Sequence, residues 1–116
     1  MQTVLLVDDD IDVRFAMSQV LKRLGYDILE AANGIEALER LRERSVDHIL
    51  LDIFMPEKDG FETINDVRRL YPDIKIIAMS GYNESSFSPL ESAKSLGANS
   101  VLAKPFSAHQ LQDALS

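Results

Sequence analysis

Three aspartates follow directly on an apolar run near the start of the chain, in the stretch VLLVDDD. Ionised carboxylates repel one another and resist burial, so a cluster beside a buried strand implies a bound cation, shifted pKa values or full solvation. Further along, Asp52 ends the apolar run HILLD, Ser80 follows IIAM, and Lys104 follows VLA. Carboxylates, a hydroxyl and an ammonium are groups that together can hold a divalent cation and a phosphate.

The elements that must position these residues alternate along the chain. Five short apolar runs predict strands over residues 3–7, 27–31, 48–52, 74–79 and 100–103. The segments between them have helical length and period, and Asn33 with Glu36 resembles a capping box at a helix start. Five strands alternating with five helices predict an α/β fold of three layers, a parallel sheet with helices on both faces.

Length and composition bound the possible functions. The chain has 116 residues, 46% of them apolar, which predicts one domain over residues 1–116. It has no cysteine, no apolar stretch of the roughly 20 residues that span a bilayer, and no signal-peptide pattern, so we expect a soluble, cytoplasmic protein. The formal net charge of −7 would repel phosphate backbones and anionic lipids, so we expect no direct nucleic acid or membrane partner.

The chain direction of a parallel sheet brings all strand ends to one edge. Ligands of open α/β sheets bind beyond that edge, at the point where the winding direction reverses. In the strand order 2-1-3-4-5 this point lies between the first and third strands, which carry Asp8, Asp9 and Asp52. The three carboxylates are therefore predicted to converge.

The charge of this cluster indicates a cofactor. Three carboxylates and the Lys104 ammonium leave a formal charge of −2, which protonation or a divalent cation must balance. Mg²⁺ fits best, because it prefers oxygen ligands and the cluster offers none of the Cys or His donors that zinc favours. Mg²⁺, a lysine and a hydroxyl around a carboxylate are the parts of a phosphoryl transfer, with Asp52 as the nucleophile.

The whole chain resembles a receiver domain of two-component response regulators, similar to the single-domain chemotaxis type. The resemblance rests on four motifs, one after each of four predicted strands: VDDD, DIFMPEKDG, MSGY and AKPF. It implies a flavodoxin-like (βα)5 fold and a signalling module that is phosphorylated by a sensor histidine kinase or a histidine phosphotransfer protein. The output would pass to an effector protein or an output domain, and no separate substrate would be turned over.

The resemblance also implies a role for each metal-site residue. Asp52 would be the phosphoacceptor, and Asp9 and Asp52 would bind Mg²⁺ directly. Asp8 would act through metal-bound water, and the main-chain carbonyl of Phe54 would be the third protein ligand.

Two further site residues and the switch follow from the same resemblance. Ser80 would contact the phosphoryl group and Lys104 would pair with it, followed by a cis bond to Pro105. Val101 stands where the family has a switching aromatic residue, so we expect the signal to pass through the loop GYNESSFSP instead. Phe54 and Tyr82 would flank the path of attacking water and set the lifetime of the acyl phosphate.

Other conspicuous residues are assigned structural roles. Asp10 is predicted to cap the first helix, and Asp12 to place a favourable charge in its first turn. Asp8 and Asp9 could themselves be solvated caps, and Lys104 an ordinary surface lysine, if their positions at strand ends were ignored. Pro56, Asp59 and Gly60 are predicted to serve the turn before the third helix. Phe106 is predicted to lie in the core, and His48 and His109 are predicted to be structural or solvated.

Two functions of other classes stay open at this point. A Mg²⁺-dependent phosphohydrolase with an aspartyl nucleophile would carry that nucleophile after the first strand, whereas the isolated Asp52 follows the third. A flavodoxin-like cofactor binder would need a phosphate-binding loop rich in Ser or Thr after the first strand, where three aspartates would repel the phosphate.

Overall fold

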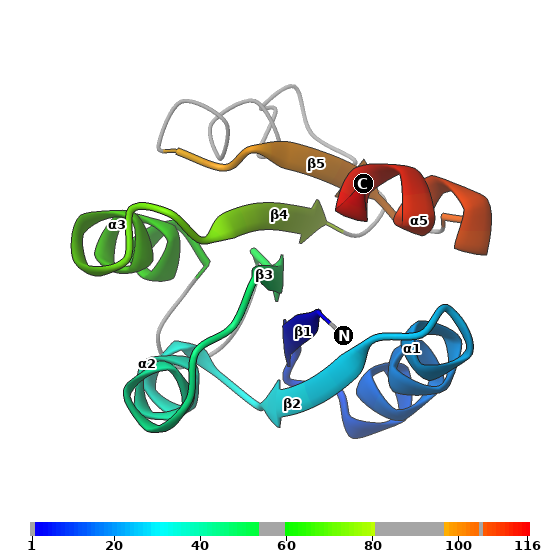
Figure 1. Cartoon of the computed structure of the whole chain (residues 1–116), viewed down its shortest axis with the longest axis horizontal. Helices are drawn as coiled ribbons and strands as arrows, with labels where there is room; N and C mark the ends of the chain where they lie inside the picture. Colours follow the sequence, from blue (N-terminus) through cyan, green and yellow to red (C-terminus); the bar gives the residue numbers. More distant parts are fainter. Residues whose placement is uncertain (1, 54–59, 81–96, 105) are drawn as a thin grey trace.

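A computed structural model describes residues 2–53, 60–80, 97–104 and 106–116. Five parallel strands form one sheet in the order β2-β1-β3-β4-β5 (Figure 1), as the sequence predicts. The strands are β1 (Thr3–Val7), β2 (Asp27–Ala31), β3 (His48–Asp52), β4 (Lys75–Ser80) and β5 (Ser100–Ala103).

Four helices lie within the described residues and cover both faces of the sheet. They are α1 (Ile11–Arg23), α2 (Gly34–Glu43), α3 (Gly60–Leu70) and α5 (Ala108–Leu115). The fourth of the five predicted helices, expected between the fourth and fifth strands, falls outside the described residues. Figure 1 shows α2 and α3 on one side of the sheet and α1 and α5 on the other, which gives the three predicted layers.

The core is divided by the sheet into two apolar clusters. Because successive strand residues point to opposite faces, Leu5 packs with α2 and α3, while Leu6 packs with α1 and α5. All five residues of β1 and of β3 are buried. Strands enclosed on both faces in this way hold their ends in fixed positions, and the candidate site lies at those ends.

One strand differs by one residue from the sequence prediction. The fourth strand is Lys75–Ser80 rather than 74–79, because Ile74 is buried without belonging to the ladder. Ser80 instead completes the ladder by pairing with Ala103. This pairing fixes Ser80 beside the end of β5.

The helix starts are held by side-chain caps. The Asp10 carboxylate accepts from the Asp12 and Val13 amides, which confirms the predicted N-cap of α1. Ser107 and Gln110 form a capping box at the start of α5, in which each side chain accepts from the main-chain amide of the other residue. In each case a local hydrogen bond fixes where the helix begins.

Gly60 is the first residue of α3, and its packing explains why a glycine stands there. A Cβ at this position would lie 2.3 Å from the Ile53 Cα atom. The Gly60 amide also donates to the Ile53 carbonyl at 2.7 Å. The start of α3 thus packs directly on the backbone that follows Asp52. The sequence predicts only a turn at Gly60 and not this contact.

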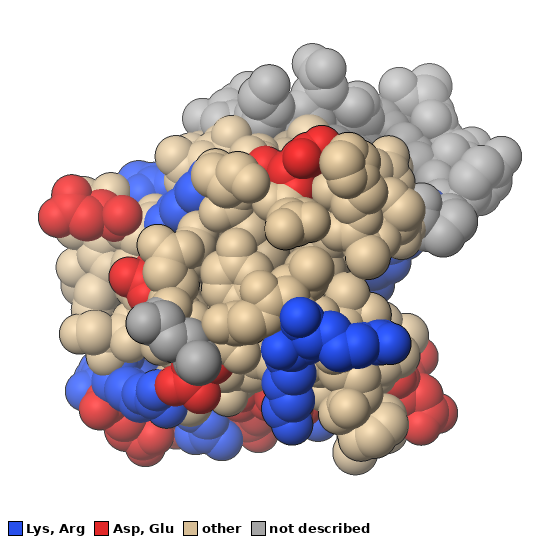
Figure 2. Space-filling view, turned by 45° about the vertical axis from the view of Figure 1, so that its right-hand side comes forward, with Lys and Arg blue, Asp and Glu red and all other residues tan. Residues whose placement is uncertain are grey.

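The surface carries charges of both signs. Figure 2 shows acidic and basic side chains interspersed on the visible face, with broad uncharged areas between them. Among the described residues, no helix combines the length and the apolar character that crossing a membrane requires.

Candidate functional site

The predicted site residues lie at the carboxyl ends of four strands. Asp8 directly follows β1, Asp52 ends β3, Ser80 ends β4, and Lys104 directly follows β5. Asp8 and Ser80 are each 1% exposed and Asp52 is 8% exposed, whereas Asp9 is exposed. Buried carboxylates on adjacent strands are costly unless cations or hydrogen bonds compensate them.

Lys104 supplies part of that compensation. Its Nζ atom donates to Asp8 Oδ2 at 3.0 Å and to Asp52 Oδ2 at 3.3 Å. Its side chain is 23% exposed, so the ammonium is largely withdrawn from water. The prediction that this lysine belongs to the site rather than to the open surface is consistent with both contacts.

The acidic surroundings change the proton affinity of Lys104. Burial alone lowers the pKa of this ammonium, but the negative charge of Asp52 and the hydrogen bond to Asp8 outweigh it. The Lys104 pKa is therefore raised above its ordinary value, and the side chain stays charged at neutral pH. A fixed positive charge beside Asp52 is suited to meeting phosphoryl oxygens.

Asp8 is held rigidly through both its main chain and its carboxylate. Its amide donates to the Ala31 carbonyl at 3.1 Å, and its Oδ1 accepts from the Asp10 amide at 3.0 Å. Its Oδ2 faces Lys104, as described above. The loop after β1 therefore presents its carboxylates in one defined arrangement.

The residues present fit a Mg²⁺ ion. Carboxylate oxygens of Asp8, Asp9 and Asp52 lie within 4.8 Å of one another. These are hard oxygen donors from two adjacent strand ends, and Mg²⁺ is typically held by one or two carboxylates together with waters and phosphate oxygens. After Lys104 is counted, the cluster retains the negative charge that a divalent cation would offset.

Some predicted site residues fall outside the part of the chain that the structure describes. They are Phe54 with its carbonyl, Pro56, Asp59, Tyr82, the remainder of the loop GYNESSFSP and Pro105, so the Lys104–Pro105 bond is not described either. Val101, which replaces the expected aromatic residue, is partly buried and packs against the cluster under α2 and α3.

The described residues that were assigned structural roles lie outside the cluster of Asp8, Asp9 and Asp52. Asp10 and Asp12 serve the start of α1, and Phe106 is partly buried against the cluster under α1 and α5. His48 is 4% exposed at the start of β3, at the opposite end of that strand from Asp52. His109 is exposed on α5, where it lies 3.5 Å from an Asp113 carboxylate oxygen.

Sequence reasoning missed Arg14 and Glu30, which reach toward the site from α1 and β2. Arg14 Nη1 donates to the Asp8 carbonyl at 2.7 Å, and its Nε donates to Glu30 Oε1 at 2.9 Å. Two signals could have found them. Arg14 is a cation in the first turn of a helix, where the macrodipole disfavours one, and Glu30 is charged inside the otherwise apolar end of its strand.

Comparison with known proteins agrees with this geometry. Residues 4–116 match the response regulator receiver domain family. The chain belongs to that family. Because the match covers nearly the whole chain, the phosphohydrolase and the flavodoxin-like cofactor binder are not favoured.

Three similar proteins illustrate the range of contexts in which the receiver domain occurs. Sporulation initiation phosphotransferase F of Bacillus subtilis is 32% identical, over 98% of this chain and 90% of the relative. The sensor kinase CckA of Brucella abortus is 43% identical over 94% of this chain, which spans only 12% of that relative's length. The crystal structure of the chemotaxis protein CheY4 of Vibrio cholerae is 34% identical, with a TM-score of 0.89 over 99% of this chain and 96% of that one.

Proposed function

We propose that this receiver domain accepts a phosphoryl group on Asp52 from a phosphohistidine donor in a Mg²⁺-dependent reaction. The observation that carries the proposal is the position of Lys104, whose ammonium bonds both Asp8 and Asp52 beyond the strand ends. Membership of the receiver family supports the reaction class.

The reaction is a transfer between two side chains. An Asp52 carboxylate oxygen attacks the phosphorus in line, and a P–O bond forms while the P–N bond to the donor imidazole breaks. The imidazole leaves and takes up a proton, and Asp52 becomes an acyl phosphate. Water then attacks the phosphorus, the P–O bond to Asp52 breaks, and inorganic phosphate leaves as the carboxylate is regenerated. Phe54 and Tyr82, which lie outside the described residues, would flank the path of this water and set the lifetime of the acyl phosphate.

Two side chains of this protein act on the transferred group. Lys104 presents a positive charge to one phosphoryl oxygen, and the Ser80 hydroxyl donates a hydrogen bond to another. Asp8, Asp9, Asp52 and the Phe54 carbonyl would hold Mg²⁺, with Asp8 acting through metal-bound water. When bound, Mg²⁺ offsets the carboxylate charge and stabilises the developing charge on the phosphoryl oxygens.

The names of two relatives support one class of phosphoryl donor. One relative is named a sensor kinase and another a phosphotransferase, which supports a histidine kinase or a phosphotransfer protein as the donor. We place the reaction in the cytoplasm, with residues 1–116 acting as one domain. The phosphorylated form would bind an effector protein or an output domain.

Val101 cannot rotate as an aromatic residue does, so the signal would pass through the loop GYNESSFSP.

A small acyl phosphate as donor tests the proposal without the cognate kinase. The protein is incubated with the donor and MgCl₂, its intact mass is measured, and the modified residue is mapped. We expect one phosphoryl group on Asp52, lost in Asp52→Asn and on chelation of the metal.

Asp12→Asn is the matched control, because Asp12 is an exposed aspartate of the same region. Its amide donates to the Asp10 N-cap, and its carboxylate lies outside the cluster. It should be labelled like the wild type. Labelling of Asp52→Asn at an unchanged rate, or labelling that is independent of Mg²⁺, would contradict the proposal.

A further inference from the structure

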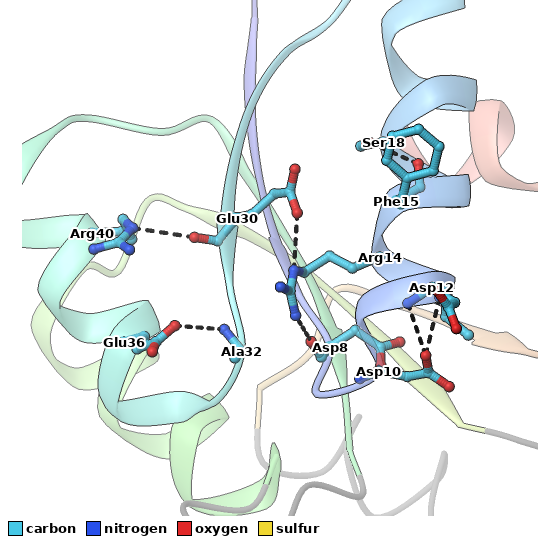
Figure 3. A network of polar contacts seen from close by, with 11 residues as sticks. Asp8, Asp10, Asp12, Arg14, Phe15, Ser18, Glu30, Ala32, Glu36 and Arg40 are labelled. Carbon is cyan, nitrogen blue, oxygen red and sulfur yellow. Dashed lines mark hydrogen bonds and ion pairs between the residues drawn. The ribbon is translucent and has the colours of Figure 1, made fainter.

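The Arg14 guanidinium joins the loop after β1 to the neighbouring strand β2. It emerges from the first turn of α1, and Figure 3 shows it lying between Asp8 and Glu30. Nη1 donates to the Asp8 main-chain carbonyl at 2.7 Å, and Nε donates to Glu30 Oε1 at 2.9 Å. The Arg14 side chain is only 14% exposed. A mostly buried arginine with two fixed acceptors is a rigid connection.

We propose that Arg14 is a positioning residue that sets the Mg²⁺ affinity of the acidic cluster by fixing the backbone between Asp8 and Asp9. The proposal rests on the metal site proposed above. Arg14 does not touch the Asp8 carboxylate in the described contacts. It holds the peptide group from which both the Asp8 and the Asp9 side chains diverge.

The Arg14 contact completes the set of bonds that immobilise Asp8. The amide is bonded to Ala31, Oδ1 to the Asp10 amide and Oδ2 to Lys104. The carbonyl is the remaining polar group of this buried residue, and Arg14 bonds it. Loss of this donor would leave the Asp8–Asp9 peptide free to rotate, and the exposed Asp9 carboxylate would lose its orientation.

Glu30 fixes the direction of the guanidinium. It lies on β2, the outer neighbour of β1, and its side chain is 45% exposed. Its main-chain carbonyl accepts from Arg40 Nε at 3.2 Å, so the strand at this point is tied to α2 as well (Figure 3). Glu30 therefore acts on the metal site through Arg14.

A purely electrostatic role for Arg14 predicts the opposite sign. Removal of a nearby positive charge would make the acidic cluster more attractive to a cation, so Mg²⁺ would bind more tightly. Removal of a positioning residue weakens binding instead. The direction of the change therefore separates the two roles.

The test is a calorimetric titration of the protein with MgCl₂. In Arg14→Gln we expect the dissociation constant for Mg²⁺ to rise ~10-fold or more, the usual effect of losing a residue that orients a metal ligand. Arg14→Lys should weaken binding as well, because a single ammonium cannot keep both contacts although the charge is retained. Arg23→Gln, at the exposed last position of α1, makes the same charge change away from the site and should bind like the wild type.

The dependence on Glu30 is tested by a double-mutant cycle. Glu30→Ala should weaken Mg²⁺ binding, and adding it to Arg14→Gln should cause no further loss, since Glu30 acts through Arg14. Glu39→Ala, at an exposed position on α2, is the matched control. Additive effects of the two substitutions would overturn the role assigned to Glu30.

A measurement without metal distinguishes this inference from the proposed metal site. In metal-free protein, amide exchange at Asp8 and Asp10 should be faster in Arg14→Gln than in the wild type, because the loop is released. If the wild type bound no Mg²⁺, the metal site would be wrong, and the exchange rates would still report on the Arg14 connection. Tighter or unchanged Mg²⁺ binding by Arg14→Gln would overturn the inference, whatever the exchange rates.

Discussion

Lys104 Nζ lies 3.0 Å from Asp8 Oδ2, and this contact joins residues that are 96 positions apart in the chain. The same nitrogen lies 3.3 Å from Asp52 Oδ2. The ends of β1, β3 and β5 are thus connected by one ammonium, although β4 separates β3 from β5 in the sheet. The stability of the site and its chemistry depend on the same charge.

Lys104→Met should destabilise the metal-free protein. The substitution leaves two buried carboxylates without their shared cation, at a cost of about 1–3 kcal/mol in the free energy of unfolding. Urea unfolding with a chelator present measures this loss. Added MgCl₂ should recover part of it, because a cation that binds only the folded state stabilises that state.

Lys22→Met is the control for Lys104→Met, because Lys22 is exposed in the last turn of α1. It should change the unfolding free energy far less. Equal losses in the two variants would show that the Lys104 contacts contribute no stability.

Asp52→Asn should lower the pKa of Lys104. The Asp52 charge is the largest of the influences that raise this pKa against the opposing effect of burial, and the substitution removes it. NMR titration of the Lys104 side chain measures the change directly. Asp12→Asn should leave the Lys104 titration as it is in the wild type, and a Lys104 pKa that is equally high in Asp52→Asn would contradict the assigned cause.

The raised Lys104 pKa has a consequence for stability at alkaline pH. The folded state favours the charged ammonium, so Lys104 adds to the free energy of unfolding. This contribution is fully present below pH 10.5, the pKa of lysine in the unfolded chain, and is lost as the pH rises through the higher Lys104 pKa of the folded protein. Unfolding measurements at rising alkaline pH should show this loss in the wild type and a smaller loss in Asp52→Asn.

The strands and the edge that carries the site could be predicted from local pattern, whereas the connections between them could not. The apolar runs 3–7, 27–31, 48–52 and 100–103 coincide with β1, β2, β3 and β5. The fourth run differed because apolar character reports burial and not hydrogen-bonded pairing, so it included Ile74 and omitted Ser80.

Arg14 and Glu30 show why part of the site was not predicted. Their local signals mark both positions as unusual but do not name a partner, and the partners come from different elements. Their contacts depend on how α1 lies across β1 and β2, which a single sequence does not reveal. Asp8, Asp52 and Lys104 were found because chain direction alone places strand ends together.

His48 should make the protein sensitive to acid. Burial disfavours the charged imidazole and lowers its pKa below the ordinary 6.5, although a hydrogen bond to the Leu115 backbone opposes this. Below pH 6.5 the unfolded chain takes up a proton that the folded protein resists. The contribution of neutral His48 to the free energy of unfolding is therefore fully present above pH 6.5. It is lost as the pH drops toward the His48 pKa of the folded protein, by at most about 1.4 kcal/mol per pH unit.

Unfolding free energies between pH 7 and pH 5 in His48→Leu measure this effect. The Nδ1 atom of His48 has no hydrogen-bond partner among the described residues, so an apolar replacement forfeits no contact there. The variant should show a flatter acid dependence than the wild type. His109→Leu, at an exposed histidine, is the control, and an acid dependence of His48→Leu as steep as that of the wild type would refute the role of His48.

Gly60→Ala should disturb both the fold and the phosphoacceptor. The added Cβ would lie 2.3 Å from the Ile53 Cα atom, and backbone cannot yield as a flexible side chain does. We expect a loss of about 1–3 kcal/mol in unfolding free energy, typical of overpacking. Because Ile53 directly follows Asp52, the rate of labelling by a small acyl phosphate should fall as well.

Gly25→Ala separates local strain from the effect on the site. Gly25 follows α1 with φ +95°, a conformation that costs other residues energy, but a Cβ there would meet nothing within 4 Å. This variant should lose stability through backbone strain and keep the wild-type labelling rate under conditions where it is folded. If Gly60→Ala, also measured while folded, were labelled as fast as Gly25→Ala, the packing of α3 on Ile53 would have no part in placing Asp52.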